Sequence, residues 1–148
     1  MRKSILAAVL MGLTLTGCTT SNKNENQNAN SMNTTLNLTQ EWDKVFPKSD
    51  KVDHKKVTVK NSYGIELAAD MYTPLNPPEG GRFAAIAVSG PFGAVKEQTS
   101  GLYAQHMAER GFLTIAFDPS FTGESGGEPR RMASPDINTE DFLASTFS

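Results

Sequence analysis

The sequence predicts an α/β fold in which an antiparallel hairpin precedes a parallel βαβ unit. Residues 55–73 alternate between apolar and polar side chains on either side of a turn, which is typical of a hairpin with one covered face. Phe83–Ser89 and Phe112–Phe117 are instead short continuous apolar runs, as expected of parallel strands that are buried on both faces. A helical segment separates these two runs, as a right-handed crossover requires.

The turn of the hairpin falls at residues 61–64, which read Asn-Ser-Tyr-Gly. Apolar side chains alternate on both sides of it, at Val57, Val59, Ile65, Leu67, Ala69 and Met71. A loop rich in proline and glycine, residues 73–81, then leads to the first apolar run. We therefore expect the hairpin to lie at the edge of the sheet, ahead of the parallel strands.

The crossover helix is predicted over Leu102–Arg110. Thr99 or Ser100 can cap its start, because a hydroxyl can accept a hydrogen bond from a free amide of the first turn. Gly111 suits its end, and Arg110 places a cation near the negative end of the helix dipole.

The first residues predict a secretory signal. Arg2 and Lys3 precede an apolar core, residues 5–15, that is too short to span a bilayer. The core ends in Leu-Thr-Gly-Cys, which resembles a bacterial lipobox with Cys18 as the lipid-bearing residue. An ordinary signal peptide with an incidental cysteine is the alternative, but Cys18 is the only cysteine and occupies the position that such a signal demands.

We therefore expect residues 1–17 to be a lipoprotein signal peptide and the mature chain to be anchored in a bacterial cell envelope. In a Gram-negative host, Thr19 in place of aspartate favours the outer membrane. Residues 18–40, rich in Asn, Ser and Thr, are expected to form a disordered tether. The domain is expected over residues 41–148, with residues 41–46 as a short helix that ends at Pro47.

Charge and composition exclude several partners. The formal charge is −2, and removal of Arg2 and Lys3 with the signal makes it −4, so nothing favours nucleic acid or anionic lipid headgroups. Membrane attachment would then depend on the lipid alone. No spacing of His, Cys, Asp and Glu indicates a metal site, and we expect no cofactor.

Residues 90–130 read GPFGAVKEQTSGLYAQHMAERGFLTIAFDPSFTGESGGEPR and resemble the α/β-hydrolase superfamily, in particular its dienelactone hydrolase-like branch. The resemblance extends over residues 55–142. It implies a small ester, lactone or similar acyl substrate and covalent acyl-enzyme chemistry. It also implies that the loop after the third strand gives a backbone N–H to the oxyanion hole. Pro91 has no N–H, so the donor would be Phe92, with Gly93 as the second candidate; alternatively, the loop is only a tight turn with Gly93 at positive φ.

Ser125 satisfies the pattern G-x-S-x-G, but we do not interpret it as the nucleophile. That role requires a strand directly before the serine and a helix directly after it. Residues 118–122 separate Ser125 from the strand, and Glu-Pro-Arg follows at 128–130. We expect a structural turn instead, in which Ser125 and Asp118 hydrogen-bond to loop amides.

The remaining polar residues are expected to be structural. His54 is placed before the first strand and His106 within the crossover helix, whereas the family's catalytic histidine follows the nucleophile and the acid in the chain. Asp136 and Asp141 are interpreted as acids near the start of the next helix, where they suit its dipole.

The nucleophile, the acid and the histidine of the family are all missing from this sequence, whose family-like pattern ends at Phe142. The last six residues lose helical amphipathicity. We therefore expect the amino-terminal part of an α/β-hydrolase, truncated before the nucleophile strand, without hydrolytic activity of its own. Without that strand, residues 84–89 would form an exposed edge of the sheet. Two alternatives remain: a non-catalytic surface lipoprotein that serves as a binding or assembly module, and an enzyme completed by a second chain.

Overall fold

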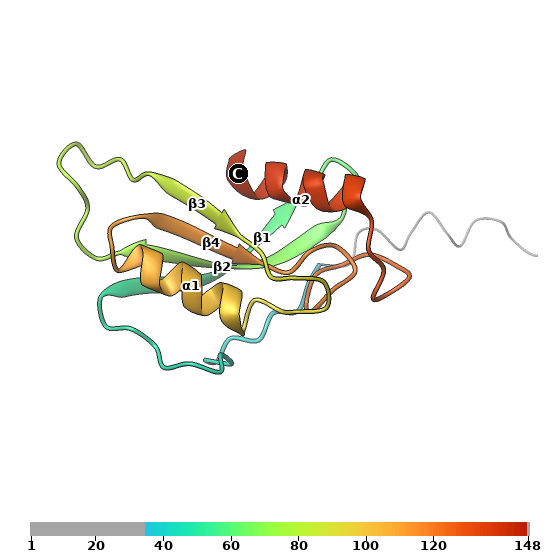
Figure 1. Ribbon diagram of the computed structural model, residues 1–148, viewed down its shortest axis with the longest axis horizontal. Coiled ribbons are helices and arrows are strands. Elements are labelled where there is room, and N and C mark those ends of the chain that lie inside the picture. The colour runs from blue at the N-terminus through green and yellow to red at the C-terminus, as the bar shows by residue number, and fades with distance from the viewer. Residues whose placement is uncertain (1–34, 148) are drawn as a thin grey trace, which may run out of the picture.

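A computed structural model describes residues 35–147. Its elements, in chain order, are β1 (Val52–Lys60), β2 (Glu66–Pro74), β3 (Ala85–Val88), α1 (Thr99–Ala108), β4 (Leu113–Phe117) and α2 (Pro135–Phe147) (Figure 1). The four strands form one mixed sheet in the order β1-β2-β4-β3.

The pairing of the strands confirms the predicted hairpin and βαβ unit. β1 and β2 are antiparallel, with Val52 opposite Pro74 and Lys60 opposite Glu66. β2 is antiparallel to β4, and β3 is parallel to β4. Helix α1 connects the two parallel strands, so the strands that read as continuous apolar runs are the ones that the crossover joins.

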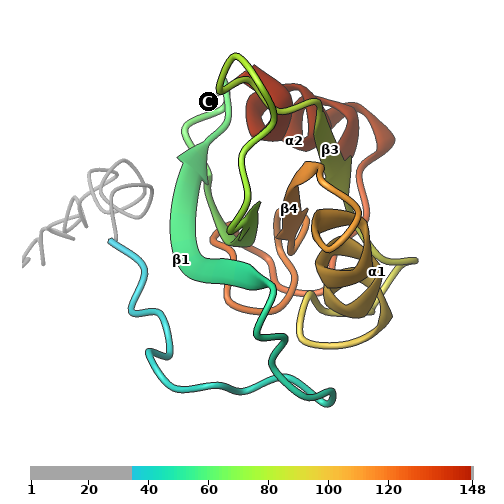
Figure 2. The same cartoon turned by 90° about the vertical axis from the view of Figure 1, so that its left-hand side faces the viewer.

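The two helices cover opposite faces of the sheet, as Figure 2 shows. On one face, Ala104 and Ala108 of α1 pack against Tyr72 and Ala116. On the other face, Ile137 and Ala144 of α2 pack against a buried cluster in β1, β2, β4, the turn between β1 and β2 and the loop after β4: Val59, Ile65, Leu67, Ala69, Phe117 and Phe121. Burial on both faces explains why β4 carries no polar alternation.

Strand β3 lies at an edge of the sheet. Within residues 35–147 it pairs only with β4, and its last three residues are only partly buried. Among the described residues, this confirms the prediction that residues 84–89 form an exposed edge of the sheet. Such an edge offers free amides and carbonyls to another strand.

Three local predictions were wrong. Residues 41–46 form no helix, although they pack on the domain: Trp42 Nε1 donates to the Phe46 carbonyl oxygen at 2.8 Å, and Phe46 is buried. Neither Thr99 nor Ser100 caps α1, because the helix already begins at Thr99 and Ser100 is buried within its first turn. His54 lies inside β1 rather than before it.

Helix α2 also differs from expectation. It continues to Phe147, so the residues that were predicted to lose amphipathicity are helical up to that point. Asp141 is not at its start but in its interior, fully buried, where it accepts hydrogen bonds from the Asn61 amide and from the Ser120 N–H and hydroxyl, each at 2.8 Å. Asp136 does lie in the first turn, as predicted.

The predicted signal peptide and Cys18 lie outside the described residues, as does most of the predicted tether. Residues 35–40 follow the domain surface: the Leu36 N–H donates to Glu66 at 3.4 Å and the Thr39 N–H to Glu124 at 3.1 Å. Within residues 35–147, neither helix has the length and apolarity that crossing a bilayer would require.

Candidate active-site loop

The loop after β3 carries the two predicted oxyanion-hole residues. A hydrogen bond of 2.9 Å from the Ala94 N–H to the Pro91 carbonyl oxygen closes a turn with Phe92 and Gly93 at its centre. Gly93 has φ +83°, which glycine adopts at the third position of a type II turn. The tight turn foreseen as the alternative is therefore present, and it does not compete with an oxyanion role.

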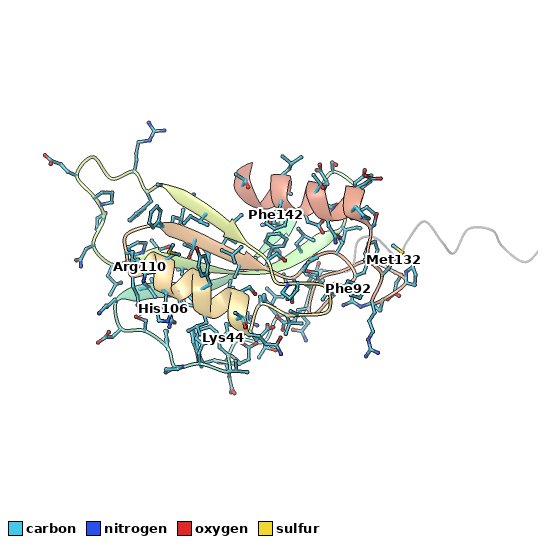
Figure 3. All side chains as sticks on the ribbon, in the orientation of Figure 1. Lys44, Phe92, His106, Arg110, Met132 and Phe142 are labelled. Carbon is cyan, nitrogen blue, oxygen red and sulfur yellow. The ribbon has the colours of Figure 1, made fainter. Side chains whose placement is uncertain are left out.

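The two amides of this turn are available. Among residues 35–147, neither the Phe92 N–H nor the Gly93 N–H has an acceptor. Phe92 is 70% exposed, and Figure 3 places it near the end of the sheet where β3 and β4 finish. Ligands of open α/β sheets bind at the carboxyl ends of the parallel strands, so the free amides lie at the expected end of the sheet.

A hollow of about 530 Å³ adjoins the turn. Its lining consists of Phe92, Gly93, Val95, Phe121, Thr122, Gly123, Arg130 and Arg131. Phe121 and Arg131 both have positive φ, of 71° and 61°, and the Arg131 N–H donates to the Phe121 carbonyl oxygen at 2.9 Å. Such backbone is uncommon outside glycine and is concentrated at functional sites.

Lys96 ties this loop to the loop after β4. Its side chain is fully buried, and its ammonium group contacts Asp118 at 2.9 Å, Glu124 at 2.8 Å and Glu97 at 2.5 Å. The Lys96 backbone N–H donates to the other Asp118 oxygen at 2.7 Å. Burial alone would lower the pKa of Lys96, but the charge of Asp118 and the hydrogen bonds to Glu124, Glu97 and Asp118 together outweigh it and raise the pKa, so the lysine is charged.

Glu124 is shared between Lys96 and a second buried lysine, Lys56 of β1. One of its oxygens lies 2.8 Å from each ammonium group. Burial opposes the charged form of Glu124, but the hydrogen bonds from the two lysines outweigh it and lower the pKa to about 2. Lys56 also contacts Asp43 at 2.6 Å, so the ionic cluster reaches the segment before β1.

Ser125 makes hydrogen bonds within the fold, as predicted, although its amide partner, Ala68, lies in β2 and not in a loop. It is 2% exposed, its hydroxyl donates to the Asp118 carbonyl oxygen at 2.7 Å, and it accepts a hydrogen bond from the Ala68 N–H at 2.8 Å. Asp118 accepts from the loop amides of Lys96 and Glu124, again as predicted. Both hydrogen-bonding directions of the serine are therefore used to hold the loop after β4 against β2.

The histidines do not complete a catalytic group. His54 contacts the buried Asp70 carboxylate at 2.8 Å, and His106 lies exposed on α1 beside Glu109. Neither histidine has a serine or cysteine hydrogen-bonded to it within the described part of the chain.

Carboxylate oxygens of Asp43, Glu97 and Glu124 lie within 4.8 Å of one another, a grouping that sequence spacing did not indicate. Lys56 and Lys96 already contribute the positive charge among them. We therefore interpret this group as an ionic cluster and not as a metal site. Sequence reasoning missed it because its members are separated along the chain and each reads singly as a surface charge.

The fold is that of the α/β-hydrolases, of which the described residues contain part. The alpha/beta hydrolase GrgF of Penicillium sp. sh18 superposes with a TM-score of 0.53 at 22% identity, over 62% of this chain and 30% of that one. The Pyrococcus furiosus esterase Pf2001 gives 0.51 at 17% identity, over 70% of this chain and 38% of that one. Identities this low establish the fold alone.

Within this fold, the chain is similar in sequence to bacterial proteins without an assigned activity. It is 62% identical to the uncharacterized protein PA2218 of Pseudomonas aeruginosa over 97% of its own length, and it spans 38% of that protein. The crystal structure of PA2218 superposes with a TM-score of 0.72 over 76% of this chain and 35% of that one. The Escherichia coli protein YcjY is 50% identical over 62% of this chain and 30% of its own length. No protein-family model matches the chain.

Proposed function

We propose that this chain contributes the oxyanion loop of an α/β-hydrolase of the dienelactone hydrolase-like branch. Its substrate would contain an ester, lactone or similar acyl bond. The observation that carries the proposal is that the N–H groups of Phe92 and Gly93, at the carboxyl end of β3 and beside the hollow, have no acceptor among residues 35–147. Attack on an acyl carbon places negative charge on the carbonyl oxygen, and two such donors would stabilise it.

We further propose that this chain, by itself, does not hydrolyse esters. Among residues 35–147, the serine with the expected sequence pattern is buried and fully hydrogen-bonded, and neither histidine contacts a nucleophile. Relatives such as PA2218 and YcjY are longer than the part that matches this chain. The activity of a whole hydrolase would then require a nucleophile, an acid and a histidine from residues outside this matched part.

The experiment uses a hybrid protein in which residues of this chain replace the matched segment of PA2218. Phe92→Pro removes the N–H and suits the second position of a type II turn, whereas Phe92→Ala keeps the N–H and removes the ring. We expect the hybrid to hydrolyse 4-nitrophenyl acetate, Phe92→Pro to lower kcat by about 100-fold, and Phe92→Ala to retain most of it.

The outcomes separate the possibilities. If Phe92→Pro and Phe92→Ala have the same kcat as the unmodified hybrid, Phe92 is not a donor and Gly93 becomes the candidate. The assay is repeated in parallel with several short esters and lactones. If the hybrid is folded, as judged by circular dichroism, and hydrolyses none of them, the hydrolase proposal is contradicted. Turnover by the isolated chain contradicts the second proposal.

The cellular location is proposed from the first residues of the sequence. Cleavage before Cys18 and attachment of diacylglycerol to its thiol would hold the domain at the envelope. Cys18→Ser should move the protein from the membrane fraction to the soluble fraction after expression in a Gram-negative host. Thr19→Asp is the matched control: it keeps the lipid and should move the protein from the outer to the inner membrane fraction.

A second candidate function is a non-catalytic binding or assembly module on the cell surface. One edge of β3 has no partner strand in the part of the chain that the structure describes, which favours this function, because an open strand edge can accept a further strand from another chain. A partner that completes the sheet and restores ester hydrolysis would instead indicate an enzyme made of two chains. Mixing the purified chain with the remaining segment of PA2218, followed by the same assay, distinguishes these two cases.

A further inference from the structure

A continuous series of ion pairs runs through the molecule beneath the candidate oxyanion loop. It begins at Asp70 in β2 and alternates in charge as far as Asp118, directly after β4. Its successive members are Asp70, Lys44, Asp43, Lys56, Glu124, Lys96 and Asp118, and the contacts between neighbours are 2.5 to 3.0 Å long. Most of these side chains are largely shielded from solvent, and those of Lys44, Asp70, Lys96 and Asp118 are fully buried.

We propose that Lys96 is the positioning residue of the oxyanion loop and fixes the Phe92–Gly93 turn relative to β4 through Asp118 and Glu124. The inference rests on the proposed function and deepens it, because it assigns the residue that sets the geometry of the two amides. Lys96 is three residues beyond Gly93, and it is held by Asp118 at two points, its backbone N–H and its ammonium group.

The two contacts between Asp118 and Lys96 connect the loop after β3 specifically to the end of β4. Asp118 directly follows β4, so a carboxylate anchored to the sheet accepts from both the main chain and the side chain of one loop residue. The Asp118 carboxylate also accepts from the Glu124 N–H, and the Glu124 carboxylate in turn contacts Lys96. The loops after β3 and β4 therefore enclose one buried ammonium group, and the hollow beside Phe92 lies between the same two loops.

Lys56 offers a matched control within the same cluster. Its ammonium group also contacts Glu124, and its side chain is only 6% exposed. It belongs to β1, however, and makes no contact with Asp118. Lys56→Met and Lys96→Met both remove one buried cation from beside Glu124, but only Lys96→Met removes the side-chain contact between the oxyanion loop and Asp118, leaving the backbone N–H of residue 96 as the remaining contact.

The first arm of the test measures the loop in the full chain without any reaction. Backbone NMR would follow the Gly93 and Ala94 amides. We expect Lys96→Met to lower their heteronuclear NOE values from those of ordered backbone to those of a mobile loop, with β1 and β2 unchanged. Lys56→Met should leave both amides ordered. Equal effects of the two variants, or no effect of Lys96→Met, would overturn the proposal.

A further variant separates positioning from simple neutralisation of charge. Lys96→Met combined with Asp118→Asn removes the buried negative charge together with the cation that balances it, and the side-chain oxygen of the new amide can still accept a backbone N–H. We expect Gly93 to stay mobile in this variant, because the ammonium contact is still missing. Restored order at Gly93 would mean that Lys96 merely neutralises Asp118, and the positioning role would be rejected.

The second arm measures kcat and KM in the hybrid protein. Lys96→Met should lower kcat at least tenfold with KM within twofold, since misplaced donors weaken stabilisation of the transition state more than binding of the substrate. Lys56→Met should keep kcat within twofold of the unmodified hybrid. If Lys96→Met and Lys56→Met change kcat and KM by the same factors, Lys96 does not position the oxyanion loop. If the unmodified hybrid is inactive, the proposed function fails, and the NMR arm still decides whether Lys96 positions the loop.

Discussion

The side-chain amide of Asn61 donates a hydrogen bond of 2.8 Å to the buried carboxylate of Asp141. Asn61 is in the turn between β1 and β2, and the same side chain accepts from the Ile65 N–H at 2.9 Å. Asp141 in turn accepts from the N–H and hydroxyl of Ser120, in the loop after β4. One carboxylate on α2 thus holds the hairpin turn and the loop after β4 together.

Asp141→Ala should therefore lower the free energy of unfolding by about 3 kcal/mol, because it leaves buried donors of Asn61 and Ser120 without an acceptor. Urea unfolding followed by circular dichroism measures the change. Asp136→Ala is the control: this acid lies exposed in the first turn of the same helix, and its loss should cost about 0.5 kcal/mol. Equal costs would show that Asp141 acts only through the helix dipole.

Ser125→Ala tests the assignment of this serine as structural. The change removes the acceptor of the Ala68 N–H and should lower the free energy of unfolding by about 1–2 kcal/mol. Below the unfolding transition, the hybrid protein should keep its kcat. Ser62→Ala, in the exposed hairpin turn, is the control for stability and should change it by less than about 0.5 kcal/mol. Loss of turnover in a folded Ser125→Ala hybrid would make the serine the nucleophile.

The sheet could be predicted from the sequence because its signals are local. Alternation marked β1, and continuous apolar runs marked β3 and β4. Strand β2 also alternates in sequence, but it is buried on both faces, because α1 covers the face that carries Tyr72. The loop residues Ser125 and Asp118 were assigned to structural roles for a similar reason. A nucleophilic serine needs a strand directly before it and a helix directly after it, and the neighbouring residues show that Ser125 has neither.

The ionic cluster could not be predicted, because its energy comes from partners that only the fold brings together. Lys56 and Lys96 are far apart in the chain, and nothing local distinguishes either from a solvated lysine. Asp141 was misassigned for the same reason: an acid near a helix start suits the dipole, and its burial depends on Asn61, eighty residues away. The segment around Trp42 was misjudged because its apolar spacing suits a helix and an irregular strap equally well.

The Glu124 carboxylate gives the fold a defined dependence on pH. Because its pKa is lowered from the ordinary 4.5 to about 2, its ion pairs contribute stability above pH 4.5 that is lost as the pH falls toward 2. Glu124→Gln should lower the free energy of unfolding at pH 7 by about 1–2 kcal/mol. This figure is reduced for solvent screening, because a quarter of the Glu124 side chain is exposed.

The measurement is urea unfolding at several pH values between about 2 and 7, a range that includes the window from 4.5 down to about 2 in which the contribution of the carboxylate is lost. The difference between Glu124→Gln and the unmodified chain should shrink as the pH falls through this window. Glu79→Gln, exposed in the loop between β2 and β3, is the control and should parallel the unmodified chain throughout. A difference for Glu124→Gln that is constant with pH would mean that the carboxylate acts by hydrogen bonding and not by charge.

Gly101, inside α1, tests how closely the helix approaches the candidate oxyanion loop. A Cβ atom there would lie 2.2 Å from the Lys96 carbonyl oxygen, 3.2 Å from the Phe46 ring and 3.3 Å from the Tyr72 hydroxyl. Alanine normally favours a helix over glycine by about 0.5–1 kcal/mol. Here the clash with backbone should reverse the sign, and Gly101→Ala should destabilise the domain by about 2 kcal/mol.

The same clash would push Lys96 away from α1, so Gly101→Ala should also disorder the Phe92–Gly93 turn. Unfolding in urea gives the first effect and the heteronuclear NOE of Gly93 the second. Tyr103→Ala, half-exposed on the same helix, is the matched control and should change stability by about 0.5 kcal/mol or less without altering Gly93. If Gly101→Ala instead stabilises the domain, the helix is not packed against the loop as closely as the structure places it, and the positioning of the loop by Lys96 would have to be reconsidered.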